Sequence, residues 1–180
     1  MAHDSHDTLW VLVKFGEAME MENESYNENE ERKRPGVERV YRNDQIAVLW
    51  EPKLCIHAGH CFRGLPEVFQ PESRPWVKVD AATADKIAEV VMTCPTGALH
   101  FERLDGGPQE PQPQETTINA RPNGPLYVRG HVRITGPGGT LIREDTRVAL
   151  CRCGYSENKP FCDASHRRVG FRTTKPPDAA

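Results

Sequence analysis

Three short apolar stretches in the N-terminal part of the chain predict β-strands. Ile46, Val48 and Trp50 alternate with their neighbours, which is the pattern of a half-buried strand. Leu99 and Phe101 fall on one side of a later stretch in the same way. The predicted strands span residues 45–50, 76–79 and 98–103.

A helix is predicted between the last two of these strands. Ile87 and Val91 lie on one face of the segment, as in an amphipathic helix. Asp80 offers a side-chain oxygen to cap the N-terminus of this helix. Pro95 disfavours the helical conformation at Cys94, so the helix should end there.

A second series of alternating apolar positions follows residue 120. Leu126, Val128, Val132 and Ile134 alternate around Gly130 and predict a strand. Gly-Pro-Gly-Gly at 136–139 predicts a turn. Two short strands should then lead directly into a cysteine-rich segment.

Composition divides the chain into four segments. Residues 105–120 are rich in Gly, Pro, Gln and Glu, which predicts a semi-extended linker. Residues 1–35 contain an acidic run that turns basic, which predicts a flexible leader. We expect an α+β fold, with the leader over 1–35, an α+β domain over 36–104, the linker over 105–120 and a small β-rich domain over 121–175.

The whole-chain composition leaves little apolar material for a large core. Hydrophobic residues make up 37% of the 180 residues, beside 15 prolines and 14 glycines. Domains with thin cores usually need disulfides, metals or oligomerisation, and six cysteines are available. The N-terminus lacks a basic signal-peptide region, and no apolar run is long enough to cross a membrane, so we expect a cytoplasmic protein. Cysteines there are more often metal ligands than disulfides.

The charge gives no electrostatic reason to expect nucleic acid or an anionic membrane as partner. The formal net charge is -3. Basic residues do gather around the last cysteines, where we expect them to balance the charge of an anionic metal cluster. They are Arg143, Arg147, Arg152, Lys159, Arg167 and Arg168.

Residues 151–166 hold the densest set of metal-ligand side chains, Cys151, Cys153, Cys162 and His166. Such a set indicates a metal site, either a zinc knuckle or a diiron centre. A single residue separates the first two cysteines, whereas paired zinc ligands are usually two to four residues apart. Asp163 is positioned to cap a short helix that carries His166.

These residues resemble the CDGSH iron–sulfur domain, the family that includes mitoNEET. The resemblance implies a [2Fe–2S] cluster held by Cys151, Cys153, Cys162 and His166. Ala164 stands where the family has the glycine of its name. Alanine disfavours a positive φ, so we expect the turn geometry to differ slightly without the loss of a ligand.

The other cysteines form a second candidate site. Cys55 and Cys61 lie in CIHAGHC, and Cys94 precedes a proline one helix later. This arrangement matches a bacterial ferredoxin half-site, except that Ala58 replaces the middle cysteine. Residues 40–103 resemble the divergent single-cluster ferredoxin family, which implies a ferredoxin-like domain.

The number of irons at the second site stays open. Three thiolates most simply hold a [3Fe–4S] cluster, whereas the [4Fe–4S] cluster implied by the resemblance needs a fourth ligand. His57 is the first candidate for that ligand and His60 the second. Zinc held by the three cysteines and a histidine is a further alternative.

Two clusters of different ligation predict electron transfer rather than catalysis, because no nucleophile–base pair or nucleotide-binding loop is present. The expected partner is a redox protein. Cluster transfer to an apo-acceptor, or redox and pH sensing through His166, is the alternative. A zinc-stapled interaction module is a third. Single CDGSH proteins dimerise, and the sequence leaves a homodimer open.

Overall fold

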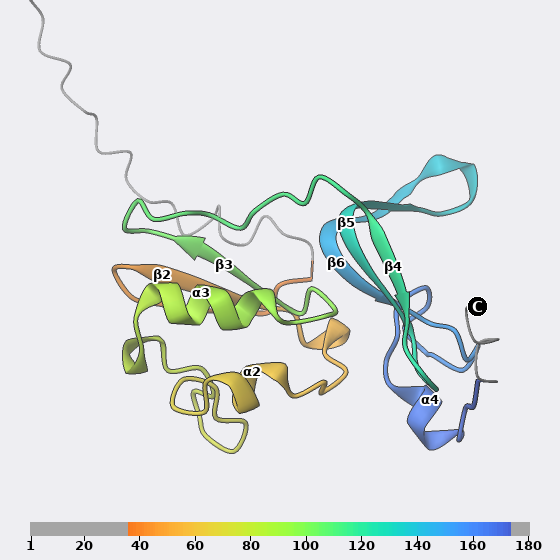
Figure 1. Ribbon diagram of the computed structural model, residues 1–180, viewed down its shortest axis with the longest axis horizontal. Helices are drawn as coiled ribbons and strands as arrows, with labels where there is room; N and C mark the ends of the chain where they lie inside the picture. Colours follow the sequence, from red (N-terminus) through yellow and green to blue (C-terminus); the bar gives the residue numbers. More distant parts are fainter. Residues whose placement is uncertain (1–35, 174–180) are drawn as a thin grey trace, which may run out of the picture.

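The computed structural model describes residues 36–173 of the chain. The leader expected over 1–35 lies outside the described residues, as do residues 174–180. The described part is a mixed α/β structure of two domains, each built on a three-stranded antiparallel sheet (Figure 1). None of its helices is long and apolar enough to cross a membrane.

The first domain places two helices beside a sheet of order β1-β2-β3. Its elements are β1 (Arg39–Arg42), β2 (Ile46–Trp50), the 3-10 turn η1 (Pro52–Leu54), α2 (His60–Gly64), the 3-10 turn η2 (Val79–Ala81), α3 (Ala84–Met92) and β3 (Leu99–Arg103). Val48 pairs with Phe101 across β2 and β3. Both side chains are buried in a core that also holds Ile87 and Val91 of α3, which is why these alternating positions are apolar.

The strands expected around residues 45–50 and 98–103 are confirmed, but the strand expected at 76–79 is wrong. Val77 makes only an isolated bridge with Phe69, and the chain then enters η2. Asp80 does not cap α3, because Asn43 donates a hydrogen bond to its carboxylate at 2.9 Å. Thr83 is the N-cap instead, and its side chain accepts a hydrogen bond from the Lys86 backbone.

The second domain is dominated by one long hairpin. Its elements are β4 (Thr117–Ala120), β5 (Leu126–Thr135), the 3-10 turn η3 (Pro137–Gly139), β6 (Leu141–Leu150) and α4 (Ser165–Arg168). β6 is one continuous strand where the sequence predicted two short ones. β4, at the end of the segment expected as a linker, pairs with β5. Gly130 has a φ of 143° beside a β-bulge, and a Cβ there would lie 2.4 Å from Thr116 Oγ1.

The two domains pack closely against each other. Leu54 and Ala98 of the first domain share one buried apolar cluster with Val128, Val148 and Phe161 of the second. Gly97 marks a close approach of the two backbones, since a Cβ there would lie 2.4 Å from the backbone oxygen of Arg147. The described domains are therefore fixed against one another rather than held only by the segment that joins them.

A buried ion network crosses the same interface. Arg147 of β6 is 1% exposed, and its Nη2 donates to the Leu99 carbonyl at 2.9 Å and to Glu110 Oε1 at 3.2 Å. His100 lies between two carboxylates, with Nδ1 2.8 Å from Glu110 Oε2 and Nε2 3.3 Å from Asp145 Oδ1. Because each charge meets an opposite one, burial of the network is tolerated.

Glu110 lies in the segment predicted as a linker, and it is the residue of that segment that joins the ion network. Residues 104–116 run from the first sheet to the second (Figure 1), and Glu110 turns inward on the way. Its Oε1 also accepts a hydrogen bond from the Phe101 backbone at 2.9 Å. A polar segment with a single inward carboxylate therefore holds the end of β3 against β6.

We expect the contribution of Glu110 to stability to disappear in acid. Burial would raise the pKa of Glu110, but His100 and Arg147 outweigh it and hold the pKa below the ordinary 4.5. A carboxyl with a lowered folded-state pKa stabilises above its unfolded pKa and loses that effect as the pH falls through the folded value. Glu110→Gln should cost about 1.5–3 kcal/mol at neutral pH. In urea unfolding, the gap to wild type should close below pH 4.5.

Comparison of the two proteins at each pH cancels effects of acid that are common to both. Glu115→Gln is the matched control, because Glu115 lies exposed in the same segment. A gap between wild type and Glu110→Gln that stays constant below pH 4.5 would contradict the assignment of Glu110 as an ionised network member.

Candidate functional site

The four ligand candidates of the second domain form two pairs. The Sγ atoms of Cys151 and Cys153 lie 3.8 Å apart. Cys162 Sγ lies 3.4 Å from Nδ1 of His166. Two thiolates bound to one tetrahedral metal with bonds of about 2.3 Å lie about 3.8 Å apart, and a thiolate and an imidazole nitrogen slightly less. Each pair therefore suits one metal, and the motif as a whole suits two.

The described residues contain no larger group of metal-ligand side chains than these pairs. Among residues 36–173, no three Cys, His, Asp or Glu side chains gather closely enough to hold a single metal ion. Burial raises the pKa of the Cys162 thiol, and the neighbouring Cys151 thiolate raises it further. Bound metal cations would offset this repulsion and keep the thiolates ionised.

Backbone N–H groups around the other pair favour a thiolate. Burial alone would raise the pKa of Cys151, but N–H groups of Ser156 and Gly154 outweigh it and lower the pKa. Gly154 has a φ of 82°, which is the left-handed conformation that glycine adopts readily. The loop after Cys151 thus places donors around sulfur.

The Cys162–His166 turn is held by the aspartate between them. Asp163 Oδ1 accepts from the Ser165 backbone at 2.9 Å, and Oδ2 accepts from Glu157 at 2.9 Å. The prediction that Asp163 is the N-cap of this helix is wrong, because α4 begins at Ser165 with Ala164 at the N-cap position, and Asp163 instead holds the turn before the helix. Ala164 adopts a φ of 70°, which is the left-handed conformation that alanine disfavours.

We expect Ala164→Gly to stabilise the protein. An L-residue in the left-handed region costs about 1–2 kcal/mol. Glycine avoids that cost, but it loses about 0.5–1 kcal/mol more backbone entropy than alanine when the chain folds. The net gain should be about 0.5–1 kcal/mol, measured as a higher urea midpoint. Ala149→Gly, at a buried strand position without positive φ, should destabilise instead. A lower midpoint for Ala164→Gly would contradict the strain argument.

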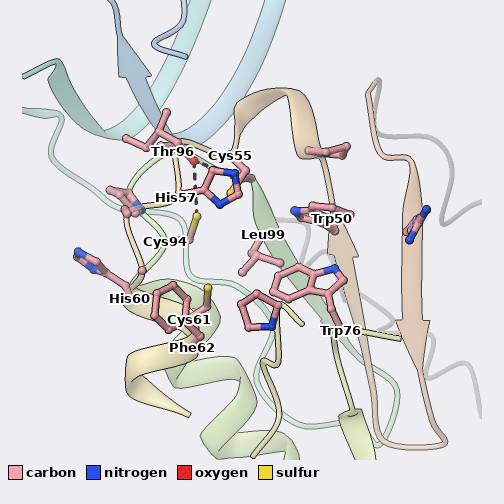
Figure 2. A pocket seen from close by; sticks show the side chains of 18 of the residues that line it. Trp50, Cys55, His57, His60, Cys61, Phe62, Trp76, Cys94, Thr96 and Leu99 are labelled. Carbon is pink, nitrogen blue, oxygen red and sulfur yellow. Dashed lines mark hydrogen bonds between the residues drawn. The ribbon is translucent and has the colours of Figure 1, made fainter. Parts of the chain in front are cut away.

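Cys55, Cys61 and Cys94 line one cavity of about 800 Å³ in the first domain (Figure 2). Cys55 follows η1, Cys61 is in α2 and Cys94 follows α3. The cavity is polar only in part, since Trp50 and Trp76 also form its wall. The structure therefore brings together the three cysteines that the sequence predicted as ligands.

The thiols in this cavity repel one another when ionised. Burial raises the pKa of Cys61 to about 11, and the charges of Cys94 and Cys55 add to the rise. Burial likewise raises the pKa of Cys55, with a further contribution from Cys94. Only a positively charged group in the cavity would hold all three as thiolates at neutral pH.

His57 and His60 differ in their position relative to these cysteines. Both line the cavity, but Figure 2 shows the His57 ring directed toward the sulfur atoms and the His60 ring directed away from them. His57 has a φ of 51°, and its backbone N–H interacts with the Cys55 sulfur. Ala58, next in sequence, offers no ligand atom. His57 is thus the candidate with suitable placement.

Thr96 is a residue of the site that the sequence did not point to. Its Oγ1 lies 3.6 Å from Cys94 Sγ, and it lines the same cavity. Trp50 and Trp76 form part of the cavity wall, but their indole Nε1 atoms are buried, without a hydrogen-bond partner in the described residues. The set of three cysteines with a neighbouring histidine fits an iron–sulfur cluster.

Two of the arginines expected to balance a cluster serve the domain interface instead. Arg147 joins the ion network described above, and Arg143 Nη1 donates to Glu51 at 2.8 Å. Arg152 donates to the Gly124 carbonyl at 2.9 Å. The expectation is wrong for Arg143 and Arg147, because β6 directs them toward the first domain before the chain reaches Cys151.

Comparisons with known proteins agree with both sites. Residues 41–103 match the family described as a divergent 4Fe-4S mono-cluster. Residues 123–167 match the family described as an iron-binding zinc finger of CDGSH type. Relatives from Escherichia coli K12 and O157:H7, both called uncharacterized protein YjdI, are 33% identical over 66 residues, which cover 37% of this chain and 87% of each relative.

The resemblances inferred from the sequence are thereby confirmed. Each match contains one complete set of ligand candidates, Cys55, Cys61 and Cys94 in the first and the Cys151–His166 motif in the second. The chain therefore belongs to the divergent 4Fe-4S mono-cluster family through its first domain and carries a CDGSH iron-binding domain as its second, which makes it an iron–sulfur protein.

Proposed function

We propose that the protein transfers single electrons and that its second domain holds a [2Fe–2S] cluster. The pairing of ligands carries this proposal: Cys151 with Cys153 at 3.8 Å, and Cys162 with His166 at 3.4 Å. Two pairs on two metals are the ligand pattern of a diiron cluster and not of a single zinc ion. A cluster so held supplies one-electron chemistry when bound.

For the first domain we propose a four-iron cluster, with His57 as the fourth ligand beside Cys55, Cys61 and Cys94. The family match favours four irons, and the orientation of His57 in Figure 2 supplies a candidate where Ala58 cannot. A three-iron cluster on the three cysteines alone is the alternative. His57→Ala separates them, because only a four-iron site should lose an iron.

A redox protein is the proposed partner, and we propose no catalytic role. The alternative is delivery of a cluster to an apo-acceptor. The two differ in the fate of the iron, since electron transfer leaves the clusters in place whereas delivery removes them.

Iron and acid-labile sulfide on anaerobically purified protein test the cluster content. We expect about six irons per chain, falling to about five in His57→Ala; about five in both would favour the three-iron cluster. His60→Ala is the matched control and should retain the wild-type count. Zinc without sulfide would overturn the proposal.

A potentiometric titration then tests the function. Both centres should take up and release one electron reversibly with no loss of iron. Iron that leaves the protein on each cycle, and reappears in an added apo-ferredoxin, would favour cluster delivery.

A further inference from the structure

The two ligand sets meet at the domain interface. Ile56 directly follows the ligand Cys55, and it is 2% exposed. It packs in one buried cluster with Ala149 and with Cys162, a ligand candidate of the other site that is 3% exposed. The residue next to a ligand candidate of the first site thus shares a buried cluster with a ligand candidate of the second.

A second group of contacts, at the same domain interface, involves two ligand candidates of the first site themselves. Cys55 and Cys94 pack against the apolar cluster that Leu54 forms with Val148 and Phe161 of the second domain. Within the second domain, the Cys162 N–H donates to the Ala149 carbonyl at 2.8 Å. Two of the three cysteines of the first site therefore pack against a cluster to which both domains contribute.

Tyr127 of β5 borders the same cluster. Its side chain packs against the group formed by Ile56, Ala149 and Cys162, beside Ala58 of the first domain and Ala164 of the second. Side chains from both domains therefore surround the place where Ile56 and Cys162 share a cluster.

The ion network fixes the separation of the sites. Arg147 lies in β6, four residues before Cys151. Glu110 and His100 hold Arg147 against the first domain. Asn158, in the loop between the two cysteine pairs, also donates to the Lys53 carbonyl at 2.8 Å. The distance between the sites is therefore set by buried contacts and not by the length of a tether.

We propose that the buried cluster of Ile56, Ala149 and Cys162 is the junction through which one electron passes between the two sites. The proposal rests on the proposed function. One site loses one electron and the other gains one, with no bond made or broken and no proton moved. The site of higher potential accepts the electron. A one-electron donor protein supplies the electron to the other site.

Flash reduction of the anaerobic, fully loaded protein tests the junction. Photoreduced deazaflavin delivers one electron, and visible absorbance follows its redistribution between the two centres. We expect a first-order process whose rate constant is independent of protein concentration. A rate that rises in proportion to protein concentration would overturn the proposal, because the electron would then pass between molecules.

Two substitutions on either side of Cys55 give a matched comparison. Ile56→Ala should slow the first-order transfer several-fold, since it removes the side chain that packs in the cluster with Ala149 and Cys162. Leu54→Ala removes an equally buried side chain from the same interface, but not from the cluster that contains Cys162, and should leave the rate nearly unchanged. Equal rates in the two variants would overturn the role of Ile56.

A measurement on wild type keeps the test independent of whether these variants fold. The electron paramagnetic resonance signal of the reduced second site should relax faster when the first site is paramagnetic than in Cys61→Ser protein, which lacks a first-site ligand. Identical relaxation would overturn the proximity. If neither centre cycles reversibly, the proposed function fails; if both cycle without intramolecular transfer, only the junction fails.

Discussion

Replacement of Arg147 by methionine should lower the free energy of unfolding by about 3–5 kcal/mol. The side chain is 1% exposed, and its guanidinium is bound by Glu110 and by the Leu99 carbonyl. Methionine fills much of the same volume but leaves the Glu110 carboxylate buried with one partner fewer. The cost arises from that uncompensated charge more than from the lost attraction.

Urea unfolding of the anaerobic protein, followed by circular dichroism, measures the change. Arg129→Met is the control, because exposed Arg129 donates to the Met92 carbonyl across the same interface at 3.0 Å and should cost far less. The double variant Arg147→Met, Glu110→Gln should recover part of the loss, since it removes both charges. Equal destabilisation by the Arg147 and Arg129 variants would contradict the assignment of the network.

Cys162→Ser should remove the second cluster almost completely. Serine cannot replace the thiolate that pairs with His166 Nδ1 at 3.4 Å, and each metal of a two-metal site depends on both of its protein ligands. We expect iron to fall by about two per chain, with loss of the corresponding visible absorption. The first cluster should remain, because its three cysteines lie on another domain.

Cys61→Ser is the reciprocal variant. Cys61 packs against the core of the first domain and not against the interface, so its substitution should remove the first cluster and spare the second. Loss of both clusters in Cys162→Ser but of only one in Cys61→Ser would show that Cys162 supports the interface as well as its own metal. Full iron content in Cys162→Ser would contradict its role as a ligand.

The local features of both sites could be predicted from sequence because they depend on neighbours in the chain. Cys151 and Cys153 are two residues apart, and Cys162 and His166 are four residues apart across a tight turn, so the local backbone brings each pair close. The strands Ile46–Trp50 and Leu99–Arg103 could likewise be predicted from alternating apolar residues, which pack in the core with α3, although the structure also buries the intervening residues of β2.

Other local features escaped prediction because a tertiary contact prevailed over local propensity. Asp80 is a good N-cap, yet Asn43 binds its carboxylate and Thr83 caps the helix instead. Ala164 disfavours a positive φ, yet the metal-ligand turn requires one and the alanine adopts it. In both cases the surrounding structure outweighs a preference of about 1 kcal/mol.

The sequence by itself determined which residues are the ligand candidates, because residue type and spacing along the chain are properties of the sequence alone. Only the tertiary structure decided that the two sites adjoin. Glu110 appears in the sequence as one polar residue in a polar linker, and Arg147 as one cation near a cysteine motif. Their meeting with His100 depends on how two sheets pack, and a free energy that arises from burying opposite charges together exists only once both domains have folded.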